Sequence, residues 1–184
     1  MLNGSGLLVA NDISASRARA LLRNIELFGI TNAFVTNETP AHLGKHFPEF
    51  FHKILLDAPC SGEGMFRKEE ALARDWTPEK SHELSSLQKE LILQAADMLR
   101  PGGLLLYSTC TFAPEEDEEV VSHLLENRPD MELLELPEYE GFTSGVPEWG
   151  NGDPSLIRSV HLFPHKMQGE GHFLHCFVKR AELI

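Results

Sequence analysis

The chain has 184 residues, of which 42% are hydrophobic and 24% charged, with a formal net charge of −12. This length and composition favour one globular domain of roughly 100–200 residues, and no stretch approaches the ~18–20 apolar residues that a membrane span needs. The negative charge excludes general attraction to nucleic-acid phosphates, so RNA binding requires a local basic patch or parts of a larger protein.

The amino-terminal segment and the cysteines predict a cytoplasmic setting. The stretch MLNGSGLLVAND has neither a basic region nor a long apolar run, so it does not resemble a signal peptide. The three cysteines are far apart and odd in number, which does not fit a disulfide framework. We therefore expect a reduced, cytoplasmic protein.

Strands and helices are predicted to alternate from the first residues onward. The apolar run GLLVAND, residues 6–12, predicts a buried parallel strand. A helix follows over residues 14–29, with Ser14 as its N-cap and Gly29 as its stop. The next strand is predicted at residues 33–36.

The middle of the chain continues the alternation. A strand is predicted at residues 54–57, and a long helix then starts with Thr77 as N-cap and Pro78 at the first helical position. Its predicted apolar face consists of Leu84, Leu87, Leu91, Ala95, Met98 and Leu99. The helix is expected to end at residues 101–103, and a strand to follow at residues 104–108.

The carboxy-terminal third is predicted to close the sheet. A helix is expected near Pro114, because acidic residues in a first turn suit the helix dipole. Residues 137–154, rich in Gly and Pro, are expected to form a long loop. Two further strands, near residues 159–163 and 173–179, are expected to pair in antiparallel fashion.

Repeated strand–helix units predict an α/β domain with a doubly wound, mostly parallel sheet and an antiparallel closing strand. In such sheets, ligands bind beyond the carboxyl ends of the strands. Asp12, Asp57 and Cys110 each follow a predicted strand end. This edge of the sheet is therefore the predicted functional site.

Two cysteines stand at neighbouring strand ends. Cys60 follows Asp57 after one strand and Cys110 follows Thr109 after the next, so both thiols are expected to face one pocket. Either cysteine alone is readily explained as a small buried hydrophobic residue. A redox pair lacks the C-x-x-C spacing, and a zinc site lacks histidines at ligand spacing.

Three motifs carry a specific family resemblance. LLDAPCSGEGMFRK (residues 55–68), LRPGGLLLYSTCTFAPEEDEEVV (residues 99–121) and FPHKMQGEGHF (residues 163–173) resemble the Sun-type RNA 5-methylcytosine methyltransferases, in particular the bacterial RsmF branch. The resemblance runs across nearly the whole chain. It implies a Rossmann-like class I methyltransferase fold, S-adenosylmethionine as methyl donor, and cytosine in 16S ribosomal RNA as acceptor.

The resemblance also implies roles for individual residues. Cys110 is expected to add its thiolate to cytosine C6, and Cys60 to assist release of the methylated product. Asp57 is expected to hydrogen-bond the cytosine edge and to contact the cofactor. Asp12 matches the family's acidic cofactor contact, although an aspartate that merely precedes a helix is the alternative.

The loop after Asp57 is the predicted RNA contact, on a target base that is unpaired or flipped out. Pro59 is expected to stiffen the turn, and Ser61 lies beside it. Gly62, together with Gly64, is expected to let the backbone approach RNA. The cations Arg67 and Lys68 are candidate contacts to RNA phosphates, with ordinary solvated surface charges as the alternative.

The chain also departs from the family pattern. Thr39 stands where the branch has an acid, with Glu38 one position earlier, and the glycine-rich cofactor loop with its lysine does not precede residues 6–12. We therefore expect residues 1–184 to form a partial methyltransferase catalytic domain, incomplete at its amino-terminal side.

Two other functions stay open at the level of the sequence. One is an inactive fragment that serves only as an RNA-binding or interaction module. The other is a DNA cytosine methyltransferase that uses Cys60 as its nucleophile.

Overall fold

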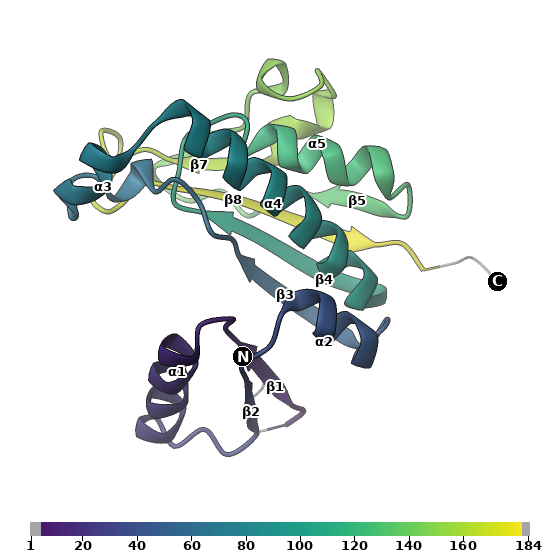
Figure 1. Ribbon diagram of the computed structural model, residues 1–184. Coiled ribbons are helices and arrows are strands. Elements are labelled where there is room, and N and C mark those ends of the chain that lie inside the picture. Colours follow the sequence, from purple (N-terminus) through teal and green to yellow (C-terminus); the bar gives the residue numbers. More distant parts are fainter. Residues whose placement is uncertain (1–4, 182–184) are drawn as a thin grey trace. The chain divides into compact units, whose positions relative to one another are not determined.

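The computed structural model describes residues 5–181 and contains two compact units, one up to His46 and one from Phe47 onward. In the first unit, two strands pair in parallel and a helix connects them (Figure 1). Its elements in chain order are β1 (Leu8–Asn11), α1 (Ala15–Leu27), β2 (Ala33–Thr36) and α2 (Pro40–His46). The prediction of one partial catalytic domain over residues 1–184 stays a prediction.

Helix α1 begins and ends where the sequence indicates. Ser14 occupies the N-cap position with extended backbone, and Gly29 follows the helix with φ 62°, in the left-handed region that favours glycine. Ala18 and Ile25 are buried, whereas Phe28, which follows the last helical residue, is 76% exposed.

The second unit is built on a six-stranded sheet. The strand order is β3-β4-β8-β7-β6, and β5 also pairs with β8. Strands β3 and β4 are parallel, and the other pairs are antiparallel. The bounds are β3 (Phe51–Asp57), β4 (Leu99–Thr109), β5 (Met131–Leu134), β6 (Phe142–Ser144), β7 (Val160–Leu162) and β8 (His172–Lys179).

Helices α4 (Pro78–Met98) and α5 (Glu118–Asn127) pack against each other and against the sheet (Figure 1). Thr77 caps α4 as predicted, since its side-chain oxygen accepts a hydrogen bond from the Lys80 amide. The remaining helical segments of this unit are short: η1 (Glu63–Met65), α3 (Glu70–Asp75), η2 (Pro147–Trp149) and η3 (Pro154–Arg158).

The hydrophobic core lies between these helices and the sheet. Along β4, Leu105, Tyr107 and Thr109 are buried, and they pair with the buried Phe177, His175 and Phe173 of β8. Burial of a large apolar side chain contributes roughly 1.5–3 kcal/mol. The core that these two strands share therefore fixes β4, and with it the loop that β4 leads into.

The α/β fold class, the parallel β1–β2 and β3–β4 pairs and the antiparallel closing strand β8 are confirmed. Several elements differ from the sequence prediction. Strand β4 begins at Leu99 rather than at residue 104, and α5 begins at Glu118, because residues 114–117 form a turn. The short elements α2, α3, β5 and β6 were not predicted, since segments of three to seven residues show too little periodicity.

The predicted apolar face of α4 is confirmed near its carboxyl end, where Ala95 and Met98 are buried, but the first half of the helix buries a different face. Leu87 is 42% exposed, whereas Ser85 and Gln88 are buried. The Ser85 hydroxyl donates to the Glu115 carbonyl, and the Gln88 amide donates to the Pro59 carbonyl. Polar side chains occupy this face because it meets backbone groups that need hydrogen-bond partners.

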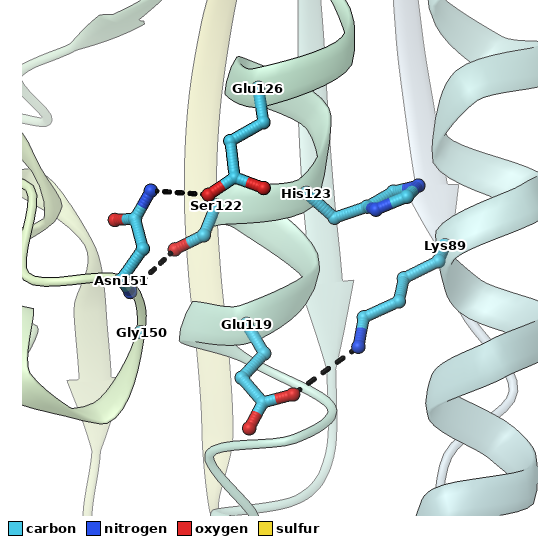
Figure 2. Close-up of a pocket in the computed structure, with 7 residues that line it drawn as sticks. All are labelled: Lys89, Glu119, Ser122, His123, Glu126, Gly150 and Asn151. Carbon is cyan, nitrogen blue, oxygen red and sulfur yellow. Dashed lines mark hydrogen bonds and ion pairs between the residues drawn. The ribbon is translucent and has the colours of Figure 1, made fainter.

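A polar groove of about 240 Å³ lies between α4, α5 and the loop around Gly150. Figure 2 shows its lining: Lys89 pairs with Glu119 at 3.2 Å, and the Asn151 side chain donates to Glu126 at 2.8 Å. These contacts join the two helices and the loop at the surface.

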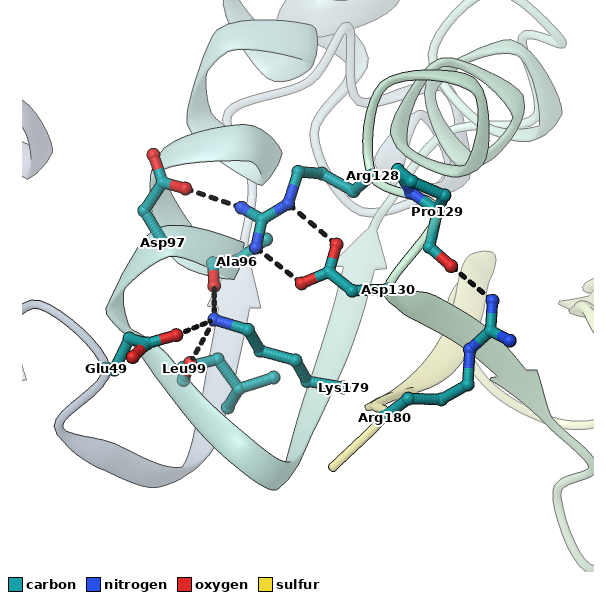
Figure 3. A network of polar contacts seen from close by, with 9 residues as sticks. All are labelled: Glu49, Ala96, Asp97, Leu99, Arg128, Pro129, Asp130, Lys179 and Arg180. Atoms are coloured by element: carbon teal, nitrogen blue, oxygen red, sulfur yellow. Dashed lines mark hydrogen bonds and ion pairs between the residues drawn. The ribbon is translucent and has the colours of Figure 1, made fainter. Parts of the chain in front are cut away.

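Another polar cluster lies at the amino end of β4 (Figure 3). The buried ammonium of Lys179 donates to Glu49 at 2.8 Å and to the carbonyls of Ala96 and Leu99 at 3.4 and 2.9 Å. It thus satisfies carbonyl groups where α4 passes into β4. Beside it, Arg128 forms a bidentate pair with Asp130, at 2.9 and 2.7 Å.

None of the helices in residues 5–181 combines the length and the hydropathy that crossing a bilayer requires.

Candidate active site

Two thiols meet at the carboxyl ends of β3 and β4. The Sγ atoms of Cys60 and Cys110 lie 3.0 Å apart, and the Cys110 amide donates to the Cys60 sulfur at 3.2 Å. The parallel register brings them together, because Asp57 pairs with Ser108 and both cysteine loops leave the sheet there. The prediction that both cysteines face one site is confirmed.

The two thiols differ in acidity. The hydrogen bond between them lowers the pKa of the Cys110 thiol and, together with burial, raises that of Cys60. A thiolate at Cys110 therefore accepts a hydrogen bond from a neutral thiol at Cys60. The thiolate form, which is the strongly nucleophilic one, is therefore favoured at Cys110 over Cys60.

Hydrogen bonds tie the two cysteine loops to each other. The hydroxyls of Ser61 and Thr111 lie 2.8 Å apart. The Glu63 carboxylate accepts from the Thr111 hydroxyl and from the Phe112 amide, both at 3.1 Å. Ser61 is 1% exposed, so its hydroxyl is directed to Thr111 rather than to solvent, and its role as an RNA contact stays a prediction.

The glycines of the loop serve packing inside the protein. Gly62 has φ 79°, a backbone conformation that disfavours other residues. Gly64 is buried against Gly171, whose amide donates to the Gly64 carbonyl at 3.0 Å, and a Cβ atom at Gly64 would collide with the Gly171 backbone. Gly64 thus approaches the backbone of Gly171, and the approach to RNA expected of Gly62 and Gly64 stays a prediction.

Two residues that the sequence analysis did not select complete the site. Glu116 and Gln88 are both fully buried, and the Gln88 amide donates to the Glu116 carboxylate at 2.9 Å. That carboxylate also accepts from the Ser61 amide at 2.9 Å. Both residues therefore contact the loop that carries Cys60.

The acidic run at residues 115–119 is largely internal. Besides Glu116, Asp117 and Glu118 are fully buried. Burial raises the pKa of Asp117 well above its usual range, although the hydrogen bond from Thr109 opposes this change. Glu118 accepts from the buried His161 at 2.7 Å. The run is therefore a poor guide to the surface potential.

The remaining predicted site residues of this unit are exposed. Asp57 ends β3, and its carboxylate accepts no hydrogen bond from the residues that the structure describes. Pro59, Arg67 and Lys68 are exposed on the loop that follows. A carboxylate at the end of β3 and two cations on the loop after it are thus exposed.

Asp12 belongs to the first unit, where it follows β1. Its carboxylate accepts from the Ser14 amide at 2.7 Å and from Arg17 at 2.8 Å, and the hydrogen bond from Arg17 lowers its pKa. Glu38 pairs with His42 at 2.7 Å. The cofactor contact assigned to Asp12 stays a prediction.

Within residues 5–181, no three His, Cys, Asp or Glu side chains gather as a metal site would require.

Residues 1–178 match the family model described as 16S rRNA methyltransferase RsmB/F. The chain belongs to this family. Among curated relatives, it is 41% identical over 175 residues to ribosomal RNA small subunit methyltransferase F of Escherichia coli strain K12, and equally to that of Shigella boydii serotype 18. The alignment covers 94% of this chain but 35% of each relative, so the chain spans about a third of their length.

Solved structures agree with this assignment. NSun6 from Pyrococcus horikoshii, crystallised with SFG, superposes with a TM-score of 0.82 at 28% identity, over 98% of this chain and 43% of that one. A methyltransferase homologue from the same organism gives a TM-score of 0.77 at 29% identity, over 98% and 55%. The Rossmann-like methyltransferase fold implied by the sequence motifs is therefore confirmed.

Proposed function

We propose that this chain carries the catalytic centre of an S-adenosylmethionine-dependent enzyme that methylates C5 of cytosine in 16S ribosomal RNA. The 3.0 Å contact between the Cys60 and Cys110 sulfurs, with a lowered pKa at Cys110 and a raised one at Cys60, is the observation that carries this proposal. Membership of the rRNA methyltransferase family supports it.

Cys110 acts as the nucleophile. Cytosine C5 is a poor nucleophile, and addition of a thiolate to C6 makes C5 electron-rich, so that it can accept a methyl group. A base then removes the C5 proton, and elimination of the thiolate restores the aromatic ring. Cysteine suits both steps because its thiolate attacks strongly and leaves readily.

Cys60 assists the elimination. Its neutral thiol lies within hydrogen-bond reach of the Cys110 sulfur, so it stabilises the negative charge that returns to Cys110 as the bond to C6 breaks. Without this donor, Cys110 would be a poorer leaving group, and the covalent adduct would persist.

The free carboxylate of Asp57 fits two contacts at the same edge of the sheet. One is the cytosine edge around N3, where it would stabilise the adduct as charge develops, and the other is the cofactor. S-adenosylmethionine supplies an electrophilic methyl group when bound. Asp12, whose two carboxylate oxygens keep lone pairs beside the bonds from Ser14 and Arg17, fits a ribose hydroxyl.

The RNA partner meets the exposed part of the Cys60 loop. Pro59 is exposed beside the thiols, and Arg67 and Lys68 are exposed cations suited to phosphates. The target base must be unpaired or flipped to reach a partly buried sulfur. Ribosomal RNA as substrate supports a cytoplasmic location for the protein.

Methyl transfer to cytosine in small-subunit RNA tests the proposal. The assay uses labelled S-adenosylmethionine, with the chain alone and with the chain joined to the flanking parts that its curated relatives have. We expect methylation with the joined protein, a fall to background for Cys110→Ala, and a rate within about twofold of wild type for Cys176→Ala, whose thiol lies on β8.

Methylation that survives Cys110→Ala would overturn the mechanism. A joined protein that retains RNA without methylating it would favour the alternative, an RNA-binding module without catalytic activity.

A further inference from the structure

The backbone on both sides of Cys60 is held by two buried side chains. Gln88 donates through Nε2 to the Pro59 carbonyl at 2.7 Å, and Glu116 accepts through Oε2 from the Ser61 amide at 2.9 Å. The same Gln88 nitrogen donates to the same Glu116 oxygen at 2.9 Å. These three hydrogen bonds connect Gln88 and Glu116 to each other and to the two residues that flank Cys60. We call Gln88 and Glu116 the clamp.

The clamp is anchored to the strand that leads to Cys110. Tyr107 of β4 is fully buried and donates its hydroxyl to the Glu116 carbonyl at 2.8 Å. The contact between the Ser61 and Thr111 hydroxyls, at 2.8 Å, adds a second link between the loops. A displacement of the clamp would therefore change the position of Cys60 relative to Cys110.

We propose that Gln88 and Glu116 are positioning residues that fix the Cys60 thiol against Cys110 and thereby set the reactivity of the pair. Neither side chain hydrogen-bonds to a sulfur atom among the described residues, so each positions the thiol through the loop backbone. The role of these residues in catalysis rests on the proposed function. The arrangement of the two thiols does not, because it is a property of the folded chain.

The composition of the clamp favours this role over simple packing. A buried carboxylate is costly unless it is fully hydrogen-bonded, and an apolar pair of similar volume is often at least as stable. Here Oε1 of Glu116 and Oε1 of Gln88 are buried without a partner among the described residues. Polar groups retained at such a cost are typical of functional sites.

The charges that act on the thiols come from several elements. Each thiol faces the other. The Asp57 carboxylate at the end of β3 raises the pKa of Cys110, and the Glu116 carboxylate raises the pKa of both thiols. The Tyr107 phenol faces Cys60 from β4. Loss of the Glu116 charge and loss of the Cys60 position are therefore expected to move the Cys110 pKa in opposite directions.

Alkylation by iodoacetamide tests the clamp on the reduced chain, without RNA or cofactor. The rates at Cys60 and Cys110 are followed against pH by mass spectrometry of the corresponding peptides. In wild type, Cys110 is expected to react at lower pH than Cys60. In Gln88→Ala, the Cys110 midpoint is expected to rise by about one pH unit, the size of one hydrogen bond to a charged group. In Glu116→Ala, the rise is expected to be smaller, because loss of the Glu116 charge lowers the Cys110 pKa.

The conservative variant separates position from charge. Glu116→Gln keeps a carbonyl acceptor and the side-chain volume, so Cys110 should still react below Cys60, while both midpoints fall because a negative charge has gone. Matched controls are Gln94→Ala on the same helix and Glu119→Gln in the same acidic run, where Glu119 pairs with Lys89 at the surface. Neither control is expected to move a midpoint.

Wild-type midpoints in a Gln88→Ala protein that retains the native circular dichroism spectrum would overturn the proposal. If the alanine variants do not fold, Glu116→Gln decides: lowered midpoints with Cys110 still below Cys60 support it, and unchanged midpoints overturn it. Because no methyl transfer is measured, failure of the clamp is distinguishable from failure of the proposed function.

Discussion

The two ends of β4 hold buried polar groups in opposite ways. At the amino end, the Lys179 ammonium donates to three acceptors, two of them carbonyls at the junction of α4 and β4. At the carboxyl end, beyond Cys110, Glu116 and Asp117 each keep a buried oxygen without a partner among the described residues. A satisfied network stabilises the fold, whereas an unsatisfied one costs stability and indicates a chemical role.

Replacement of Lys179 by methionine is the largest effect expected at neutral pH and tests the satisfied end. The carbonyls of Ala96 and Leu99 would lose their donor, so the free energy of unfolding in urea should fall by about 2–3 kcal/mol. The control Arg180→Ala removes an exposed side chain and should cost less than about 0.5 kcal/mol. A loss no larger for Lys179 than for Arg180 would remove the contrast between the two ends.

His175 tests the middle of the sheet, where it pairs with Tyr107 of β4. Burial, with a smaller effect of Arg158, lowers its pKa to about 3. Because the unfolded histidine titrates near 6.5, the stability that this neutral residue contributes is present above that pH and lost as the pH falls toward 3.

Urea unfolding between pH 7 and pH 4 measures this loss. The slope due to His175 should approach about 1.4 kcal/mol per pH unit below pH 6, and His175→Gln should remove it. The exposed His165, replaced by Gln, serves as the control and should leave the wild-type slope unchanged. An equal slope in wild type and His175→Gln would show that the buried imidazole is not the source.

Asp117 gives the smallest effect and tests the unsatisfied end. Burial raises its pKa in the folded chain, so its contribution to stability is present below the unfolded pKa and is lost as the pH rises through the folded one. Asp117→Asn keeps an acceptor for the Thr109 hydroxyl and cannot ionise. The free energy of unfolding of Asp117→Asn, relative to that of wild type, should therefore rise by about 1 kcal/mol as the pH increases from 5 to 8.

Unfolding curves of the two proteins at both pH values measure this gain, with the exposed Asp75→Asn as a matched control. If Asp117→Asn and wild type lose the same stability between pH 5 and pH 8, the buried Asp117 carboxyl group does not destabilise the carboxyl end of β4.

The strand ends and the two cysteines could be predicted from sequence, because apolar runs and punctuating residues mark strand termini clearly. Gln88 and Glu116 could not. Apolar periodicity predicted burial of Leu84, Leu87 and Leu91. The buried face of α4 instead includes Ser85 and Gln88, which donate hydrogen bonds to backbone carbonyls of distant segments. From sequence alone, a run of acidic residues indicates a solvated surface. The groups that donate hydrogen bonds to the buried Glu116, the Ser61 amide and the Gln88 side chain, are distant in sequence.

The covalent adduct between Cys110 and cytosine tests the central claim most directly. With S-adenosylmethionine and small-subunit RNA, the joined protein with Cys60→Ala should accumulate an RNA–protein adduct on a denaturing gel, and Cys110→Ala should form none. An adduct that persists in Cys110→Ala and disappears in Cys60→Ala would contradict the assignment and make Cys60 the nucleophile.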